Sequence, residues 1–542
     1  MPERSGSVLL ERGDTERMQP PTRFVLPVRW AAALALLSGL AAAAAFPRLG
    51  IWPLAIVSVA GLSWAVDGRR ARTGAWLGFA YGLTFFVPLL HWTGVYVGAA
   101  PWLILAVAEA GFMAGLGAVL TLVQRLPLAP VWIGTVWVLQ EALRDRVPFG
   151  GFPWGRLAFS QVGSPLRWIV VEGGAPVLSF AVAVSGGALA MAARCIRRPA
   201  PWRPLASAVA VLVLVPVLGQ IIGAVAIPDV GSSRLKVALI QGSVPDRGLA
   251  FEDRAGQVLD NHVAQTLRLA AEVKAGTAAQ PDLVVWPENA SDLDPLVDKV
   301  AAAKITRAVR AIKAPVLVGA ILDGPGANHR RNAGILWSPT TGPGAEYIKR
   351  HPVPFGEYMP LRSIADKVSS AAKLVTQDMV AGTGNGLLKG GPVPIGDVIC
   401  FEVAYDGLVQ SSVVAGAQLL VVQTNNATFG HTSETYQQLA MSRLRAIETG
   451  RTVLQVSTTG ASAIIDPKGG LTAQSGALFR PAILTADVAL ETAKTNAVRW
   501  GAVPEWVLAG LAVAAAAAST VMSRRSGRPA APAPESEEMA TT

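Results

Sequence analysis

Long runs of apolar residues fill the first 230 positions of the chain, and one more run lies close to its end. A helix needs about 20 apolar residues to cross a bilayer, and several of these runs approach that length. The run at 51–66 is short, and the run at 130–143 contains Gln140 and Glu141, so these two are the weaker candidates. The pattern predicts about eight transmembrane helices, at 27–45, 51–66, 74–93, 101–123, 130–143, 167–193, 204–228 and 503–522.

Between the seventh and the eighth run the pattern changes to short apolar segments that alternate with helical stretches. Strands connected by helices form layered α/β domains, so this region predicts one. Helical patterns occur at about 252–275, 294–312 and 433–449. Strand-length apolar segments occur at 235–241, 283–286, 316–322, 333–337, 347–349, 398–401, 419–424, 453–458 and 463–465.

These patterns divide the chain into five parts. We expect a disordered cytoplasmic tail at 1–24, a seven-span membrane domain at 25–229, an α/β domain at 230–498, an eighth transmembrane helix at 499–523 and a disordered cytoplasmic tail at 524–542. The fold class is therefore a polytopic α-helical membrane protein that carries an α/β domain.

The composition supports a membrane protein. Of the 542 residues, 51% are hydrophobic and 15% are charged, whereas soluble domains have about 25% charged residues. The formal net charge of +10 suggests nucleic acid binding at first sight. Most of the basic excess lies beside the apolar runs, however, where basic residues typically flank membrane spans. We therefore expect no nucleic acid partner.

Arginine clusters predict the orientation, because cytoplasmic loops carry an excess of Lys and Arg. With a cytoplasmic N-terminus, seven crossings place the α/β domain on the extracytoplasmic side. Arg144, Arg146 and Arg156 lie in an outward loop and count against this orientation. Three clusters favour it, and they consist of Arg69, Arg70 and Arg72, of Arg194, Arg197, Arg198 and Arg203, and of Arg524, Arg525 and Arg528.

Three apolar segments of the α/β region end on side chains that together suit acyl transfer: Glu288, Lys349 and Cys400. A thiol near neutral pH needs an adjacent base, and a carboxylate can take its proton. A fixed cation and the backbone N–H after the nucleophile can stabilise the oxyanion that acyl transfer generates. A lone cysteine is more often an inert core residue. It is the set of three that predicts a thioester-forming site.

The motifs around these residues resemble the catalytic blocks of the nitrilase, or carbon–nitrogen hydrolase, superfamily. The resemblance implies a four-layer αββα sandwich in which Glu288 is the general base, Lys349 the oxyanion stabiliser and Cys400 the nucleophile. It also implies supporting roles for Glu357, Phe401 and Glu402. The three blocks are Trp286-Pro287-Glu288, then Lys349 followed by Val353-Pro354-Phe355-Gly356-Glu357-Tyr358, and Ile399-Cys400-Phe401-Glu402.

Set among eight spans, these blocks resemble the apolipoprotein N-acyltransferase family over about residues 25–522. The resemblance implies a multi-pass protein of the bacterial cytoplasmic membrane with its catalytic domain on the extracytoplasmic face. In the implied reaction, Cys400 takes an acyl chain from a membrane phospholipid as a thioester. The α-amine of an apolipoprotein's N-terminal diacylglyceryl-cysteine then takes the chain as an amide. The implied partners are the phospholipid donor, the apolipoprotein acceptor and the bilayer, with no cofactor.

The chain departs from the family pattern in places. Phe401 stands where tyrosine is common, and Phe251 stands where tryptophan is expected. The segment 425–430 reads Asn-Asn-Ala-Thr-Phe-Gly in place of the more usual Asn-Asp-Ala-Trp-Phe-Gly. These changes bear on substrate preference more than on activity.

Two other functions stay open. A membrane-anchored amidase or nitrilase that hydrolyses a small amide would use the same three residues with water as the acceptor. The farther alternative is a non-enzymatic membrane protein with an inactive outer domain. The outward loop Gly150-Gly151-Phe152-Pro153-Trp154 leaves a choice as well, between an interfacial aromatic belt and a loop that touches the substrate.

The remaining cysteine and the histidines suggest no further chemistry. Cys195 is expected at the cytoplasmic end of the sixth span, so the membrane separates it from Cys400 and excludes a disulfide between them. The chain has five histidines, none paired at metal-ligand spacing, and we expect no metal site.

Overall fold

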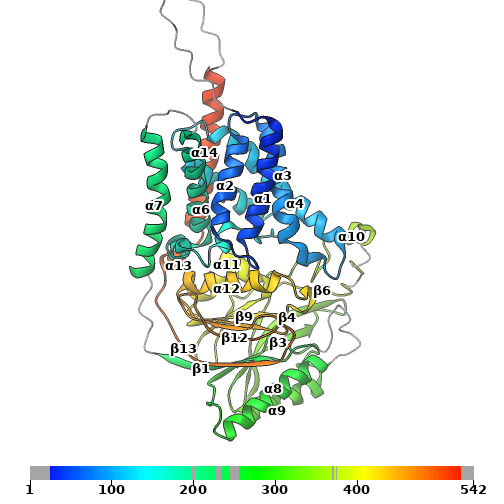
Figure 1. Cartoon of the computed structure of the whole chain (residues 1–542). Helices are drawn as coiled ribbons and strands as arrows, with labels where there is room; N and C mark the ends of the chain where they lie inside the picture. The colour runs from blue at the N-terminus through cyan, green and yellow to red at the C-terminus, as the bar shows by residue number, and fades with distance from the viewer. Residues whose placement is uncertain are drawn as a thin grey trace, which may run out of the picture.

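The computed structural model describes residues 25–196, 202–225, 233–244, 256–368, 372–373 and 375–526. The expected tail at 1–24, residues 527–542 of the expected tail at 524–542, and Phe251 lie outside these residues. Residues 524–526 of that second tail continue a helix, so its predicted start was wrong. Within the described chain, a bundle of long helices stands on one side of a layered α/β domain (Figure 1).

Eight helices form where the eight apolar runs predict them. Five of the helices of the described chain, α1, α4, α6, α7 and α14, are long and apolar enough to cross a membrane, with η3 counted into the α6 span, and α2 is a shorter apolar helix. Eight helices thus lie at the predicted positions, but the predicted count of about eight spans is not confirmed, because length and composition single out five helices of the described chain. The eight are α1 (Val28–Ala45), α2 (Pro53–Val66), α3 (Ala71–Leu89), α4 (Ala99–Val123), α5 (Ala129–Arg144), α6 (Val170–Ile196), α7 (Trp202–Val225) and α14 (Val503–Ser526).

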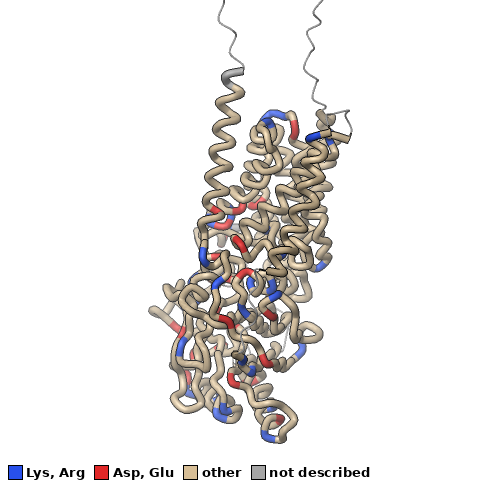
Figure 2. Tube along the Cα trace, turned by 90° about the vertical axis from the view of Figure 1, so that its left-hand side faces the viewer, with Lys and Arg blue, Asp and Glu red and all other residues tan. Residues whose placement is uncertain are grey.

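Charged residues are sparse along the helices and gather at their ends and in the α/β domain (Figure 2). At the end farther from the α/β domain, Arg194 pairs with Asp67 at 2.8 Å. Arg69 in the same loop as Asp67 donates to the carbonyl oxygens of Ala65 and Leu26. Arg69 and Arg194, one from each of the first two arginine clusters, therefore lie at the same end of the bundle, as the predicted orientation requires.

The α/β domain contains two sheets. The first has the strand order β13-β1-β2-β3-β4-β5, with β6 paired to β4, and the second has the order β12-β11-β10-β9-β8-β7. The strands of the first sheet are β1 (Arg234–Gln241), β2 (Leu283–Val285), β3 (Val316–Asp323), β4 (His329–Ser338), β5 (Gly342–Ile348), β6 (Asp378–Met379) and β13 (Ala482–Ala489). Those of the second are β7 (Leu387–Leu388), β8 (Ile395–Ile399), β9 (Leu419–Thr424), β10 (Val453–Ser457), β11 (Ala463–Ile465) and β12 (Leu471–Gln474).

The two sheets pack face to face, and helices cover both outer faces. Alternate residues of β1 show the arrangement: Val237 and Leu239 enter the core between the sheets, whereas Ala238 and Ile240 enter the core beneath the helices. Helices α8 (Gln257–Lys274) and α9 (Lys299–Ile312) cover the first sheet, and α11 (Asp406–Val414) and α12 (Glu434–Thr449) cover the second. The implied four-layer αββα sandwich is confirmed. Helix α12 lies between the second sheet and the membrane helices (Figure 1).

Several predicted boundaries were wrong. The helix expected at 294–312 begins at Lys299, because the Asp298 side chain caps it by accepting from the N–H groups of Val300 and Ala301. The strand expected at 398–401 ends at Ile399, since Cys400 begins the 3₁₀ helix η6 (Cys400–Ala404). The patterns missed the short strands β6, β7 and β12, the edge strand β13, and the helices α11 and α13 (Asn496–Trp500). A further short helix, α10 (Arg362–Val368), precedes β6.

A cluster of buried charges joins the two domains, and we call it the junction cluster. Arg156 lies 2.9 Å from Asp406 and 3.3 Å from Asp145, and Arg445 lies 2.7 Å from Asp406. The three arginines of the cluster are at most 2% exposed. This pairing explains why arginines are tolerated in the outward loop: carboxylates neutralise them. The junction cluster consists of Glu109, Glu141, Arg144, Asp145, Arg156, Asp406, Arg445 and Glu448.

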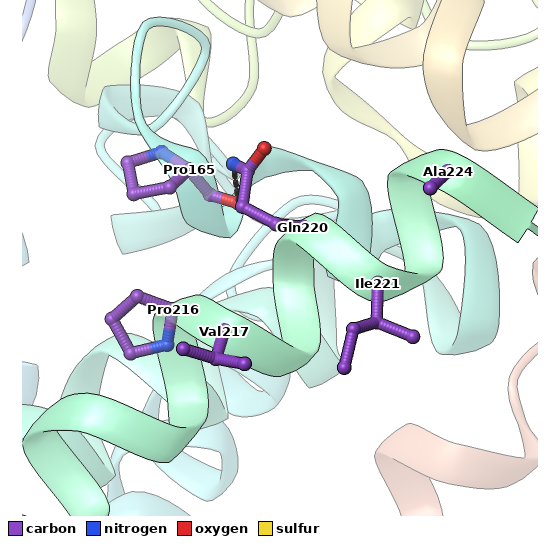
Figure 3. Close-up of a pocket in the computed structure, with 6 residues that line it drawn as sticks. All are labelled: Pro165, Pro216, Val217, Gln220, Ile221 and Ala224. Atoms are coloured by element: carbon purple, nitrogen blue, oxygen red, sulfur yellow. Dashed lines mark hydrogen bonds between the residues drawn. The ribbon is translucent and has the colours of Figure 1, made fainter.

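A shallow apolar groove lies between helix α7 and the 3₁₀ helix η3 (Pro165–Ile169), as Figure 3 shows. The Gln220 amide spans it and donates to the Pro165 carbonyl oxygen at 3.3 Å. The groove is lined by Pro165, Pro216, Val217, Gln220, Ile221 and Ala224, so it contains none of the predicted catalytic residues.

Candidate active site

The structure brings Glu288, Lys349 and Cys400 together at the ends of strands from both sheets. Glu288 follows β2 and Lys349 follows β5 in the first sheet, and Cys400 follows β8 in the second. Cys400 has a φ of 54°, in the left-handed region that is unfavourable for residues other than glycine. Such strained residues collect at functional sites, and the surrounding structure must hold them in place.

The Glu288 carboxylate is 4% exposed and is held by three donors. Its Oε1 accepts from Lys349 Nζ at 3.1 Å and from Asn332 Nδ2 at 2.7 Å, and its Oε2 accepts from the Asn425 N–H at 2.8 Å. The backbone beside it packs closely on Gly319, where an added Cβ would lie 2.1 Å from the Pro287 carbonyl oxygen. The carboxylate therefore has a fixed position.

Lys349 is 1% exposed and lies between two carboxylates. Its Nζ donates to Glu288 at 3.1 Å and to Glu357 at 2.9 Å. Burial lowers the pKa of the Lys349 ammonium, but Glu288 and Glu357 more than offset this, so the pKa stands well above its ordinary value. The side chain is a permanent cation, which is the property that an oxyanion stabiliser needs.

Glu357 holds both the lysine and the loop that leads away from it. Its Oε1 also accepts from Asn332 Nδ2 at 3.1 Å, and its Oε2 accepts from the Val353 N–H at 2.7 Å. Asn332 thus bridges Glu288 and Glu357. Glu357 is thus in contact with the lysine and fixed by its hydrogen bonds, an arrangement that fits the predicted supporting role.

The Cys400 thiol is half-buried and faces the end of strand β9. The Thr424 hydroxyl lies 3.4 Å from Sγ, and the next residue, Asn425, binds Glu288. Burial raises the pKa of the Cys400 thiol, and the negative charge of Glu288 raises it further, while Lys349 acts in the opposite direction. The resting thiol is therefore protonated, and a base must take its proton when it attacks.

Glu402 fastens the nucleophile turn to the lysine segment. It is fully buried, and it accepts from the N–H groups of Ile399 at 2.9 Å, Arg350 at 2.7 Å and His351 at 3.1 Å. The Tyr347 hydroxyl donates to it at 3.0 Å. Burial raises the pKa of Glu402, while these backbone bonds act against that rise. Its contacts hold Cys400 and Lys349 in register.

The outward loop of the membrane domain lies directly against the nucleophile turn. The rings of Trp154 and Phe401 stack with their centroids 5.5 Å apart and their planes 3° apart, and Phe152 stacks on Phe401 at 5.4 Å. The Tyr405 hydroxyl donates to the Gly151 carbonyl oxygen at 3.0 Å. The sequence left two interpretations of this loop, an interfacial aromatic belt and a loop that touches the substrate. The contact with Phe401 favours the second.

Sequence reasoning missed three residues around the site, Asn332, Thr424 and Gln438, and it noted Asn426 only as a departure from the family pattern. Asn332 lies within strand β4 and is 1% exposed. In the sequence it stands between two arginines and the apolar segment 333–337, so no local pattern distinguished it from the polar residues before it. Among the residues that the structure describes, no group of His, Cys, Asp and Glu could hold a metal ion.

The fold and the site define the class: a carbon–nitrogen hydrolase domain with a buried Glu and Lys beside a half-buried Cys, attached to a helical membrane domain. The family model of the carbon-nitrogen hydrolases matches residues 236–497, and that of the apolipoprotein N-acyltransferase N-terminal domain matches residues 38–188. Together with the relatives below, these matches show that the chain belongs to the apolipoprotein N-acyltransferase family, and it is a bacterial membrane protein.

The apolipoprotein N-acyltransferase of Mycolicibacterium smegmatis is 41% identical over 504 residues, which cover 88% of this chain and 83% of that protein. The apolipoprotein N-acyltransferase of Geobacter metallireducens is 31% identical, with 93% of this chain and 98% of that protein covered. Among solved structures, a Nesterenkonia amidase of the nitrilase superfamily has a TM-score of 0.36 at 18% identity, over 50% of this chain and 95% of its own.

Proposed function

We propose that this protein transfers an acyl chain from a membrane phospholipid, through a thioester on Cys400, to the α-amine of the N-terminal diacylglyceryl-cysteine of apolipoproteins. One observation carries the proposal: the Cys400 thiol lies beside a fixed carboxylate and a buried lysine, and a loop of the membrane domain packs on the same turn. Membership of the apolipoprotein N-acyltransferase family supports the acceptor.

In the first half-reaction, Glu288 takes the thiol proton and Cys400 Sγ attacks the carbonyl carbon of the phospholipid ester. A C–S bond forms, and the carbonyl oxygen becomes an oxyanion that Lys349 Nζ and the Phe401 N–H stabilise. When the C–O bond breaks, the lysophospholipid alkoxide leaves with the proton that Glu288 held. The products are an S-acyl enzyme and a neutral alcohol.

In the second half-reaction, the free α-amine attacks the thioester carbonyl carbon and Glu288 takes a proton from the attacking nitrogen. The same cation stabilises the second oxyanion. The C–N bond forms and the C–S bond breaks, and the departing sulfur recovers its proton from Glu288. The carboxylate thus returns to its starting state, and the cycle needs no cofactor.

The surroundings of the site support a lipid substrate over a small amide. Phe149 and Phe355 are 41% and 51% exposed, and their rings meet edge to face at 5.8 Å beside the loop that carries Glu357. Leu361 and Ile364, at the start of helix α10, are also exposed. Exposed apolar side chains in such numbers mark a surface for lipid or protein contact.

The orientation belongs to the same proposal: the α/β domain lies on the extracytoplasmic face, where the acceptor's diacylglyceryl-cysteine is found. Arg69 and Arg194 lie at the other end of the bundle, and arginine clusters favour the cytoplasmic side. A reporter fused after Pro199 reads cytoplasmic, and one inserted near Gly231 reads external. Both reporters on one side would contradict the predicted number of crossings.

Intact-protein mass spectrometry tests the acyl-enzyme. After incubation with phospholipid of a single acyl composition, the wild-type protein gains the mass of one acyl chain less the displaced hydrogen. Cys400→Ala gains nothing, and Cys400→Ser remains nearly inactive, since Glu288 is poorly matched to a hydroxyl of much higher pKa. Cys195→Ser is the matched control, and it acquires the adduct. An adduct or normal turnover in Cys400→Ala would overturn the proposal.

A further inference from the structure

Two polar side chains, Thr424 and Gln438, also lie within hydrogen-bonding distance of the Cys400 sulfur. Gln438, on helix α12, is fully buried, and its Nε2 lies 3.7 Å from Sγ, a distance typical of an N–H to sulfur hydrogen bond. Thr424 lies 3.4 Å from the same sulfur. The mechanism described above uses neither of them.

The orientation of the Gln438 amide is fixed by its oxygen. Gln438 Oε1 accepts from the Thr424 hydroxyl at 2.8 Å and from Asn426 Nδ2 at 3.0 Å. A glutamine amide has one accepting end and one donating end, so two donors on the oxygen leave the nitrogen facing the sulfur. When the single Thr424 proton goes to Gln438, Nε2 is the donor that bonds to Sγ.

The Asn426 amide is fixed in the same way. Its Nδ2 donates to Glu434 Oε2 at 2.8 Å, and its Oδ1 accepts from the Ser457 hydroxyl at 2.5 Å. Glu434 is 1% exposed and belongs to the same helix as Gln438. The hydrogen bonds therefore have a consistent direction: Glu434 accepts, Asn426 donates to both of its neighbours, and Gln438 donates to the sulfur.

We infer that Gln438 is a further catalytic residue of the acyl transfer, and this inference rests on the proposed function. Its Nε2–H donates a hydrogen bond to the Cys400 thiolate. Asn426 and Glu434 are positioning residues, because they orient the Gln438 amide. The thiolate forms twice in each cycle, once on attack and once when the thioester is cleaved. A hydrogen bond to the anion stabilises both states more than it stabilises the neutral thiol. No atom is transferred to or from Gln438.

Alkylation of Cys400 by iodoacetamide, followed across a range of pH, tests this role without any acyl substrate. The background is Cys195→Ser, so that a single thiol reacts. Gln438→Met nearly conserves the volume and removes the donor. Because a hydrogen bond to a charged group contributes about 1.5–3 kcal/mol, this variant alkylates roughly ten- to a hundredfold more slowly than the wild type at any pH below the thiol midpoint.

Two further variants separate a positioning role from a structural one. Glu434→Ala slows alkylation in the same direction by a smaller factor, and Glu434→Gln restores the wild-type profile because its amide oxygen still accepts from Asn426. The matched control is Gln437→Met, since the Gln437 side chain is held by Trp154 and by the Leu89 carbonyl oxygen, away from the sulfur. That variant keeps the wild-type profile.

An unchanged profile in folded Gln438→Met protein would overturn the role of Gln438. If Gln438→Met folds poorly, Gln438→Leu is measured in its place, with thermal unfolding as the check on folding. Slow alkylation in Gln438→Met together with a wild-type profile in Glu434→Ala would overturn only the positioning roles of Asn426 and Glu434. Because alkylation needs no lipid, these outcomes are independent of whether the protein forms an acyl-enzyme.

Discussion

The described part of the chain contains two clusters of buried charge, the junction cluster and the candidate active site, and they differ in what they can do. The junction cluster pairs three arginines with five carboxylates, and the site pairs one lysine with Glu288 and Glu357. In the junction cluster, Arg445 also donates to the carbonyl oxygens of Val403 and Ala404, at 2.8 and 2.9 Å. Its guanidinium is fully engaged in bonds to carboxylates and backbone oxygens, and these bonds connect the nucleophile turn to α12.

In the site, by contrast, the charges stand around a group that can react. Lys349 has a compact ammonium that faces two carboxylates, and the Cys400 thiol lies within its electrostatic reach. Arginine suits permanent buried pairs because its planar fork is held by several acceptors, whereas an ammonium is a point charge that can meet an oxyanion. Burial of charge is therefore common to both clusters, and only the presence of a nucleophile marks the site.

The largest effect on turnover is expected at Glu288. Glu288→Gln removes the base from both half-reactions, so neither acyl-enzyme formation nor transfer proceeds. Burial and the Glu288 charge both raise the pKa of the Cys400 thiol, so loss of that charge lowers this pKa and increases the thiolate at a given pH. Iodoacetamide therefore alkylates Cys400 faster in this variant than in the wild type, while transfer is absent. Slower alkylation together with lost transfer would mean that Glu288 mainly supports the fold.

The next effect is expected at Lys349. Lys349→Ala removes the cation from both oxyanions, and the rates of thioester formation and of transfer both fall by roughly 10²–10³ if the ammonium acts like an oxyanion-hole donor. Single-turnover measurements of each half-reaction separate the two rates. A loss confined to one half-reaction would contradict a shared oxyanion site.

The junction cluster should respond in stability more than in chemistry. Asp406→Ala leaves the buried Arg156 and Arg445 without their shared carboxylate, which costs about 3–5 kcal/mol in the free energy of unfolding. Folded variant protein still forms the acyl-enzyme. Denaturant unfolding in detergent measures the loss of stability, and mass spectrometry of the folded fraction measures the acyl adduct. Loss of the adduct from well-folded protein would place the junction cluster in the chemistry.

The pH dependence of this contribution has a definite sign. Burial raises the pKa of the Asp406 carboxyl, but Arg156 and Arg445 more than offset the rise, so the pKa in the folded protein lies below its ordinary value. The stabilisation is therefore present at neutral pH and is lost as the pH falls through the acidic range. Asp406→Ala unfolds with a correspondingly weaker dependence on acid.

The smallest effect serves as the control for the junction cluster. Glu272 forms an exposed pair with Arg268 at 3.0 Å, one helical turn apart on α8. Exposed pairs of this kind contribute at most about 0.5 kcal/mol. Glu272→Ala therefore leaves the unfolding free energy and the adduct close to those of the wild type. An effect as large as that of Asp406→Ala would mean that burial does not decide the strength of these pairs.

The sequence predicted the parts of this molecule that depend on local patterns. Apolar runs located the eight helices of the bundle, because a helix that is buried in lipid or in a protein core consists mostly of apolar residues. The edge strand β13 was missed although its residues are largely apolar; it is half-exposed and pairs with β1 across more than 240 residues. Its existence depends on its partner, which no local pattern shows.

The residues of the site also fall into those that a local pattern predicts and those that only the packing reveals. Glu288, Lys349 and Cys400 each close an apolar segment within a recognisable motif. Gln438 lies inside a helix, 38 residues after the cysteine, and only the packing of α12 on the second sheet brings its amide to the sulfur. Buried glutamines in helices carry no motif. The structure was needed to distinguish Gln438, which faces the thiol, from Gln437, which faces the membrane domain.

The most direct test of the account is the fate of a preformed acyl-enzyme. The S-acyl protein is prepared with phospholipid, freed of donor, and divided into samples with buffer alone, with a diacylglyceryl-cysteinyl peptide, and with the N-acetylated form of that peptide. The account predicts that the thioester persists in buffer and with the blocked peptide, and that it discharges to the free α-amine as an amide. Rapid discharge to water in the absence of peptide, with free fatty acid as the main product, would contradict acyl transfer and assign the protein to the hydrolases.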